Sequence, residues 1–362
     1  MIDFEPTDEQ QLIVETVRQF AANEIRPVAR DAAEARKLPG AVLGQAHELG
    51  LVALGLDSAH GGGGERSALT GVLIAEELAF GDLAIALAIL SPSMTALPVN
   101  DFGSEEQKRR LLPAFTAARF APGALALLES DPRFDPLHPE TRATRDGGDF
   151  VLSGEKCLVP WIDGGEEVLV IAREDDAPQA FIVPRSAHGL VATPEKNLGL
   201  DALPTMELAL DGVRVPAGAR LGGESGCDVR AIIIRGRVGL AATAIGVARA
   251  AFEIARDYAK QREAFGAPIA TKQAIAFKLA DMAIEIDALR MLVWEAAWHL
   301  DVGADAARPA LLASRQAARV AVEVTDGAVQ VLGGHGYIRD YLPEMQLRNA
   351  RGFACFEALT LV

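Results

Sequence analysis

Cysteine is scarce in this chain of 362 residues, and its three copies, Cys157, Cys227 and Cys355, stand far apart. A disulfide scaffold or a structural zinc site needs numerous or closely grouped cysteines, and no Cys-x-x-Cys pair is present. The sequence therefore argues against both kinds of stabilisation. It fits the reducing cytoplasm, which is the location we expect.

An excess of positive charge is also missing, since 50 acidic residues face 35 lysines and arginines and leave a net charge of −15. Nucleic acids and anionic membranes bind through basic surfaces, so we expect neither as a partner. An anionic ligand would have to be held by local arginines.

Three further signals are absent. No run of about 18 apolar residues predicts a membrane span. The opening residues Met-Ile-Asp-Phe-Glu-Pro lack the basic and apolar regions of a signal peptide. The glycine run 61–64 is not followed by Gly-Lys-Ser/Thr, so it is not a phosphate-binding loop of that type.

What is present is a folded α+β chain, with 50% hydrophobic and 23% charged residues. Helical periodicity occupies the first third and returns from about Asp228 onward. Between them, short β-rich runs alternate with Gly, Pro, Asp and Asn. We therefore expect three domains: a helical one over 1–120, a β domain over 121–222 and a helical one over 223–362.

Particular residues support this division. Thr7 with Gln10 predicts a capping box that opens a helix, and Ser104 predicts the start of another. The middle domain should be an antiparallel sheet, whose strands include those at Phe150, Val168, Ala180 and Met206. Three helices are expected at the end of the chain: Ile232–Tyr258, Thr271–Leu300 and Pro309–Leu332.

The most informative stretch lies in the C-terminal third. Arg262-Glu-Ala-Phe-Gly follows the first of these helices, Gln330-Val-Leu-Gly-Gly-His-Gly-Tyr ends the third, and Glu357 comes after both. These motifs, in this order, resemble the acyl-CoA dehydrogenase family, and the resemblance covers essentially the whole chain. It implies an N-terminal helical domain, a middle β-barrel domain and a C-terminal four-helix bundle.

The resemblance also implies an FAD cofactor. A guanidinium at Arg262 suits a pyrophosphate, because it offers planar paired donors and keeps its charge. Glycines let the backbone approach the dinucleotide closely. The residues so assigned to FAD are Arg262, Phe265, Gln273, Gln330, Gly333 and Gly334. From the residues alone, a solvated charge at Arg262 and a helix cap at the glycines are an equally good reading.

Glu357 matches the position of the family's catalytic base. The α-proton of a thioester is weakly acidic, and a desolvated glutamate can remove it while hydride leaves the β-carbon for flavin N5. The family's alternative position for the base is Gly236 here, which favours Glu357. Arg237 beside it is expected to contact substrate. The resemblance thus implies oxidation of an acyl-CoA to a trans-2-enoyl-CoA in fatty acid breakdown, with an electron-transfer flavoprotein as acceptor.

The middle domain departs from the family pattern. Leu128 and Phe134 replace hydroxyl residues that serve flavin and substrate, Leu158 replaces a tryptophan that covers the flavin, and Pro160 replaces a threonine that binds N5. Two hypotheses remain open. The chain is either an enzyme with a remodelled pocket, or a cofactor-poor partner subunit that completes a neighbour's FAD site. Because its helices are apolar on several faces, we expect a homo- or hetero-oligomer, a dimer or a tetramer.

Overall fold

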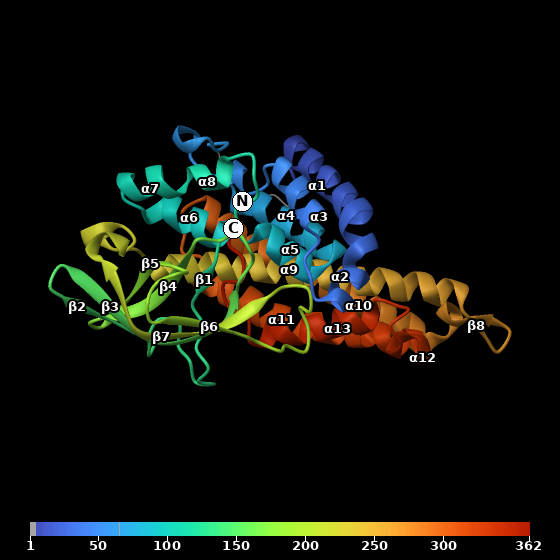
Figure 1. Ribbon diagram of the computed structural model, residues 1–362. Coiled ribbons are helices and arrows are strands. Elements are labelled where there is room, and N and C mark those ends of the chain that lie inside the picture. The colour runs from blue at the N-terminus through green and yellow to red at the C-terminus, as the bar shows by residue number, and fades with distance from the viewer. Residues whose placement is uncertain (1–4, 65) are drawn as a thin grey trace.

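The longest element is helix α9 (Val229–Gln261), around which the rest of the chain is arranged (Figure 1). The computed structural model describes residues 5–64 and 66–362. Two more long helices, α10 (Gln273–Asp301) and α11 (Ala307–Leu332), pack along α9. All three contain the helices expected from the sequence. The short helices α12 (Gly334–Tyr337) and α13 (Pro343–Ala350) complete this C-terminal domain.

The N-terminal domain is helical as predicted. Thr7 and Gln10 form the expected capping box at the start of α1, and Ser104 and Gln107 form another at α7. Helix α4 lies directly against α9. The helices are α1 (Asp8–Phe20), α2 (Ala29–Ala35), α3 (Gly40–Glu48), α4 (Ala68–Gly81), α5 (Leu83–Leu90), α6 (Ser93–Phe102), α7 (Glu105–Leu111) and α8 (Pro113–Thr116).

The middle domain is one seven-stranded sheet, and it is mixed rather than purely antiparallel. Its order is β1-β4-β2-β3-β7-β6, with β5 paired to β4. The strands are β1 (Leu125–Ala126), β2 (Arg142–Asp146), β3 (Asp149–Pro160), β4 (Glu167–Glu174), β5 (Ala177–Pro184), β6 (Leu190–Pro194) and β7 (Thr205–Pro216).

The expected antiparallel sheet is therefore wrong at β4, which pairs in parallel with both β1 and β2. These pairings join strands that are distant in the sequence, so no hairpin signal announces them. Nor do the strand pairs described here form the closed barrel that the resemblance implied. The predicted strands at Phe150, Val168, Ala180 and Met206 all lie in the sheet.

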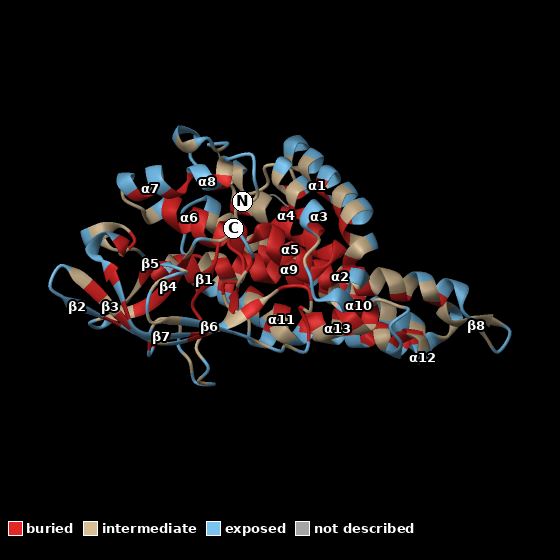
Figure 2. Ribbon diagram, in the orientation of Figure 1, coloured by how far each residue is buried: buried red, intermediate tan, exposed pale blue. Residues whose placement is uncertain are grey.

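The core lies where α4, α5 and α9 meet, and Figure 2 shows these helices almost wholly buried. Two helical segments, Leu83–Phe102 and Val229–Gln261, are long and apolar enough to span a membrane by composition, contrary to the expectation from the sequence. Their apolar windows are 94% and 78% buried inside the molecule. This burial is what the core helices of a large domain require, because they are covered on every side.

Candidate functional site

Glu357 is held by a two-pronged ion pair with Arg237 of α9. The guanidinium Nη2 donates to Glu357 Oε1 at 2.8 Å, and Nε donates to Oε1 and Oε2 at 3.1 and 3.2 Å. Both side chains are about one-fifth exposed, so the pair is partly desolvated. Such paired geometry fixes the plane of a carboxylate. Oε2 accepts the single, longer bond and is the freer of the two oxygens.

This pair borders a groove of about 430 Å³ between α11 and the turn before Glu357. Its polar wall includes Ser314 and two further arginines, Arg315 and Arg319. Arg319 is engaged by Glu285 and Glu323. Arg315 is exposed and forms no ion pair within residues 5–64 and 66–362.

A loop of the middle domain faces the same place. The pKa of Asp135 in this loop is lowered, first by the His138 side chain and then by the Leu137 N–H, and the charge of Arg237 contributes. Phe134 of the loop packs against the core cluster that contains Ala358. The groove therefore lies where the sheet domain and the helical domain meet.

Strand β3 carries the positions at which the sequence departs from the family pattern. The Leu158 N–H is occupied by the Glu195 carboxylate, which lies 3.1 Å away. Pro160 has no N–H, and the Trp161 N–H donates to the Pro204 carbonyl at 2.9 Å. Leu158 also has a left-handed φ of 53°, at a bulge in the β3–β7 pairing. Consecutive groups of this strand are thus unable to donate to a flavin ring in this arrangement.

The residues assigned to FAD lie at the opposite end of α9. Arg262 caps α9, and the hairpin of β8 (Glu263–Ala264) and β9 (Ala267–Pro268) follows it. Phe265 at the hairpin tip is 98% exposed and shares a positive φ with Gly266, the geometry of a tight type I′ turn. Figure 1 shows this hairpin projecting from the end of the molecule.

The other FAD positions converge on this end. Gln273 begins α10, and Gln330 lies in the last turn of α11. The Tyr258 hydroxyl lies 2.7 Å from His335 Nδ1, which ties the turn after α11 to the end of α9. Gly333 and Gly334 have open space where a Cβ would stand. Within the described residues, the side chains of Arg262, Gln273 and Gln330 have no hydrogen-bond partner, so this end fits an anionic ligand.

The two halves are far apart. Twenty-five residues of helix separate Arg237 from Arg262, and at 1.5 Å per residue they lie about 37 Å apart. One dinucleotide cannot reach from Glu357 to Arg262 of the same chain. Each end therefore needs a complement from another molecule.

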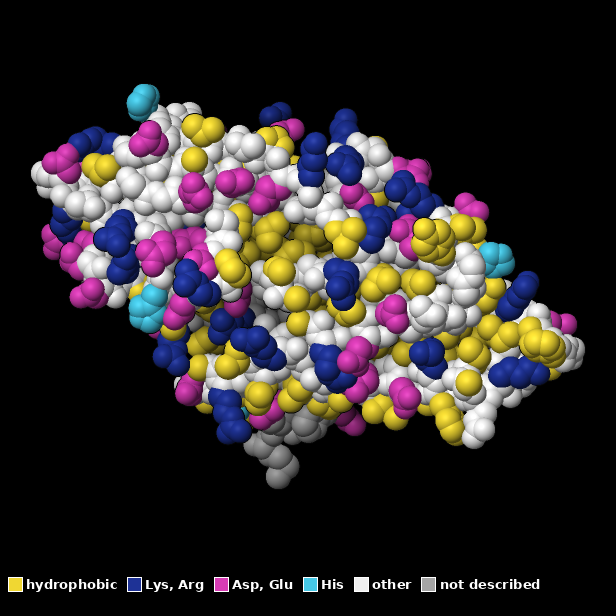
Figure 3. All heavy atoms as spheres, turned by 90° about the horizontal axis from the view of Figure 1, so that it is seen from below, with side chains coloured by type: hydrophobic (Ala, Val, Ile, Leu, Met, Phe, Trp, Pro, Cys, Tyr) yellow, Lys and Arg dark blue, Asp and Glu magenta, His cyan; other side chains and the backbone are white. Residues whose placement is uncertain are grey.

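Figure 3 shows hydrophobic side chains gathered in the middle of one face and again at the hairpin end. Helix α10 also exposes Phe277 (59%), Ile284 (64%) and Met291 (38%), spaced seven residues apart on one side. Exposed apolar rows of this kind mark contact surfaces.

Sequence reasoning missed Glu195, Arg315 and Arg319. Glu195 lies 37 residues after Leu158, and no local signal links the two positions. The two arginines lie four residues apart on α11 and read as a solvated helix face. Only the fold places them beside Glu357.

A helical domain, a sheet domain and a bundle that places a carboxylate beside one groove and a cationic turn at the far end define the architecture of a flavin-dependent dehydrogenase. Three family models match in order: the N-terminal domain of acyl-CoA dehydrogenase over residues 7–119, its middle domain over 124–213 and its C-terminal domain over 229–357.

Individual relatives agree. The probable acyl-CoA dehydrogenase YngJ of Bacillus subtilis is 35% identical over 362 residues, covering 97% of this chain and 94% of the relative. The structure of butyryl-CoA dehydrogenase from Megasphaera elsdenii matches with a TM-score of 0.89 at 31% identity, over 98% and 95% of the two chains. A glutaryl-CoA dehydrogenase from Mycobacterium smegmatis in complex with FADH2 matches at 0.88 and 29%, over 97% and 91%.

The chain belongs to the acyl-CoA dehydrogenase family. It is accordingly an oxidoreductase with FAD as its cofactor and an acyl-CoA as its substrate class.

Proposed function

We propose that the chain catalyses α,β-dehydrogenation of an acyl-CoA thioester, with Glu357 as the base. The observation that carries the proposal is the position of Glu357, a half-buried carboxylate at a groove between two domains. Its freer oxygen, Oε2, accepts the α-proton. FAD, when bound, supplies the hydride acceptor.

Arg237 has a different role from the substrate contact expected of it. Because its donors are committed to Glu357, we assign it the task of orienting the carboxylate and keeping it charged before proton transfer. Arg315 is the free cation of the groove wall and is suited to a phosphate or carboxylate of the ligand.

The arrangement also supports an oligomer. FAD held near Glu357 of one subunit would receive Arg262, Gln273, Gln330 and the Gly333–Gly334 turn from another, because these lie about 37 Å away in the same chain. Phe265 at the hairpin tip would reach across with them. An electron-transfer flavoprotein is the acceptor we propose, and the cytoplasm is the compartment.

The test of the base is Glu357→Gln, which keeps the size of the side chain and removes its charge. We expect acyl-CoA binding to persist and substrate-dependent bleaching of the flavin to slow by about 10²–10⁴-fold. Gln316→Glu, a change on the exposed part of α11, serves as a control that alters charge away from Glu357. Undiminished bleaching in Glu357→Gln would remove it from the mechanism.

A second function is favoured by strand β3, where Pro160 and the occupied Leu158 N–H offer a flavin ring no donor. In that case the chain is a partner subunit that lends Arg262 and Gln273 to a neighbour's FAD. Co-expression with an unlike family member would then give a yellow complex with fewer flavins than subunits. Arg262→Ala should strip flavin from this complex.

A further inference from the structure

The five residues that follow Glu357 turn inward and are almost completely buried. Ala358, Leu359, Thr360, Leu361 and Val362 are between 0% and 6% exposed and belong to no helix or strand. Leu359 and Val362 pack with one apolar core, whereas Ala358 and Leu361 pack with another. The 358–362 segment therefore fills the space between the two cores directly behind the proposed base.

Glycines on two helices make room for this segment. A Cβ on Gly236 would lie 2.8 Å from Ala358, and one on Gly239 would lie 3.2 Å from Thr360 and Val362. On α4, a Cβ at Gly71 would lie 3.0 Å from the Val362 side chain. These glycines form a channel that the segment occupies tightly.

Polar contacts fix the segment in the channel. The Leu361 N–H donates to Ser93 Oγ at 3.0 Å. The Val362 carbonyl accepts from Arg235 at 2.9 Å and from Arg66 at 3.1 Å. Arg66 is in turn paired with Asp101. The segment is thus held at both its main-chain N–H and its carbonyl groups.

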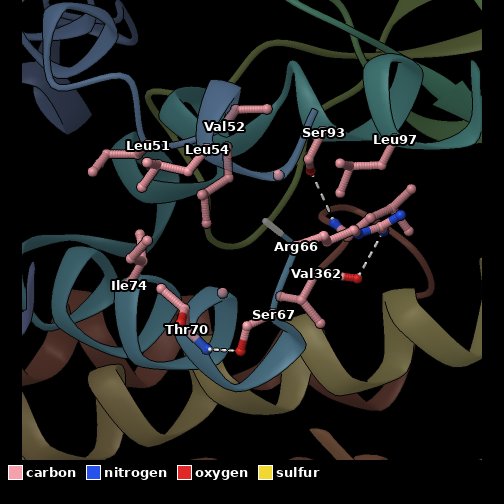
Figure 4. Close-up of a pocket in the computed structure, with 14 residues that line it drawn as sticks. Leu51, Val52, Leu54, Arg66, Ser67, Thr70, Ile74, Ser93, Leu97 and Val362 are labelled. Carbon is pink, nitrogen blue, oxygen red and sulfur yellow. Dashed lines mark hydrogen bonds between the residues drawn. The ribbon is translucent and has the colours of Figure 1, made fainter. Parts of the chain in front are cut away.

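Little space remains at the end of the channel. Figure 4 shows a cavity lined by Leu54, Ile74 and Leu97, with Val362 and Ser93 at its side, and Leu361 also borders it. Its volume is about 60 Å³. A dry cavity of about 150 Å³ holds benzene, so about 60 Å³ leaves room for only two or three carbons.

We propose that the 358–362 segment is an internal stop that limits the acyl group to a short chain. This inference rests on the proposed function, because it assumes that the thioester lies at Glu357. An aliphatic chain that extends past Glu357 meets Leu361 and Val362, and the remaining wall of the groove is polar and cannot replace apolar burial. The side chain of Leu361 is the specificity-determining group.

The experiment measures the binding of butyryl-, hexanoyl-, octanoyl- and dodecanoyl-CoA to the holoprotein by calorimetry, with flavin bleaching as a second readout. Each buried methylene strengthens binding about fourfold. For the wild type we expect affinity to stop rising after the shortest members. Leu361→Ala removes three carbons, so the rise should continue over about three more methylenes, or roughly 60-fold.

Two further variants keep the result interpretable. Leu97→Ala enlarges the same cavity from its opposite wall and should shift the limit in the same direction without touching the segment. Leu210→Ala, in the separate core of the sheet, costs similar stability and should leave the limit unchanged.

Wild-type affinity that rises steadily to dodecanoyl-CoA would overturn the stop while leaving the proposed function intact. An unchanged limit in both Leu361→Ala and Leu97→Ala would overturn it as well. If none of the thioesters binds the wild type, the proposed function itself fails and this inference falls with it.

Discussion

Beneath the candidate flavin strand, a buried ion pair joins Glu129 to Lys156 of β3. Lys156 Nζ donates to Glu129 Oε1 at 2.8 Å and to the Leu127 carbonyl at 3.1 Å. The lysine side chain is fully buried and the glutamate side chain 8% exposed. Burial lowers the pKa of Lys156 to about 8 in spite of Glu129, so the pair is charged at neutral pH.

Removing one partner leaves the other as a lone buried charge, which costs about 3–5 kcal/mol. Lys156→Met should show this cost near its lower end, because Glu129 keeps the N–H donors of Glu140 and Thr141. For a chain of this length that unfolds as one unit, the loss corresponds to a fall in Tm of about 4–7 °C. Scanning calorimetry of the purified protein at pH 7 measures it.

The double variant Glu129→Leu with Lys156→Met separates the pair from its surroundings. Replacing both charges by apolar side chains is often neutral, so we expect the double variant to recover most of the loss. Additive losses would refute the reasoning, as would a Tm change below about 1 °C for Lys156→Met alone.

Two other predictions concern stability. Burial raises the pKa of Asp82 to about 6, above the ordinary value near 4, so its contribution is present at low pH and is lost as pH rises from about 4 to 6. The free energy of unfolding of the wild type relative to Asp82→Asn should therefore fall by roughly 3 kcal/mol across this range in urea titrations, and a flat difference would contradict it. Gly246→Ala places a Cβ 2.2 Å from the Glu76 carbonyl where α4 crosses α9 and should cost about 1–3 kcal/mol or more, whereas Gly44→Ala meets open space in α3 and should be neutral or slightly stabilising. Equal denaturation midpoints for the two glycine variants would show that the crossing is not tight.

The sequence predicted the helices well because their signals are local. Thr7 with Gln10 and Ser104 with Gln107 are capping patterns within one turn, and the period of α9 to α11 is visible over many turns. The parallel pairing of β4 with β1 and β2 depends on chain crossings instead. Its short strands, such as Leu125–Ala126, carry too few residues to show a period.

The candidate site was predicted only in its residue types. Motif resemblance selected Glu357 and Arg237, but their ion pair joins positions 120 residues apart and depends on how the turn after α13 meets α9. Likewise, nothing near Leu158 indicates that Glu195 occupies its N–H, or that residues 358–362 turn into the core. Each of these contacts is set by packing between elements distant in the sequence.

The most direct test of the account is the flavin content of this chain expressed alone, followed by anaerobic titration with butyryl-CoA. A self-sufficient dehydrogenase should purify with one FAD per subunit, and the flavin absorption should bleach on addition of the thioester. A colourless protein that stays without flavin in excess FAD, and becomes yellow only with an unlike subunit, would contradict the account.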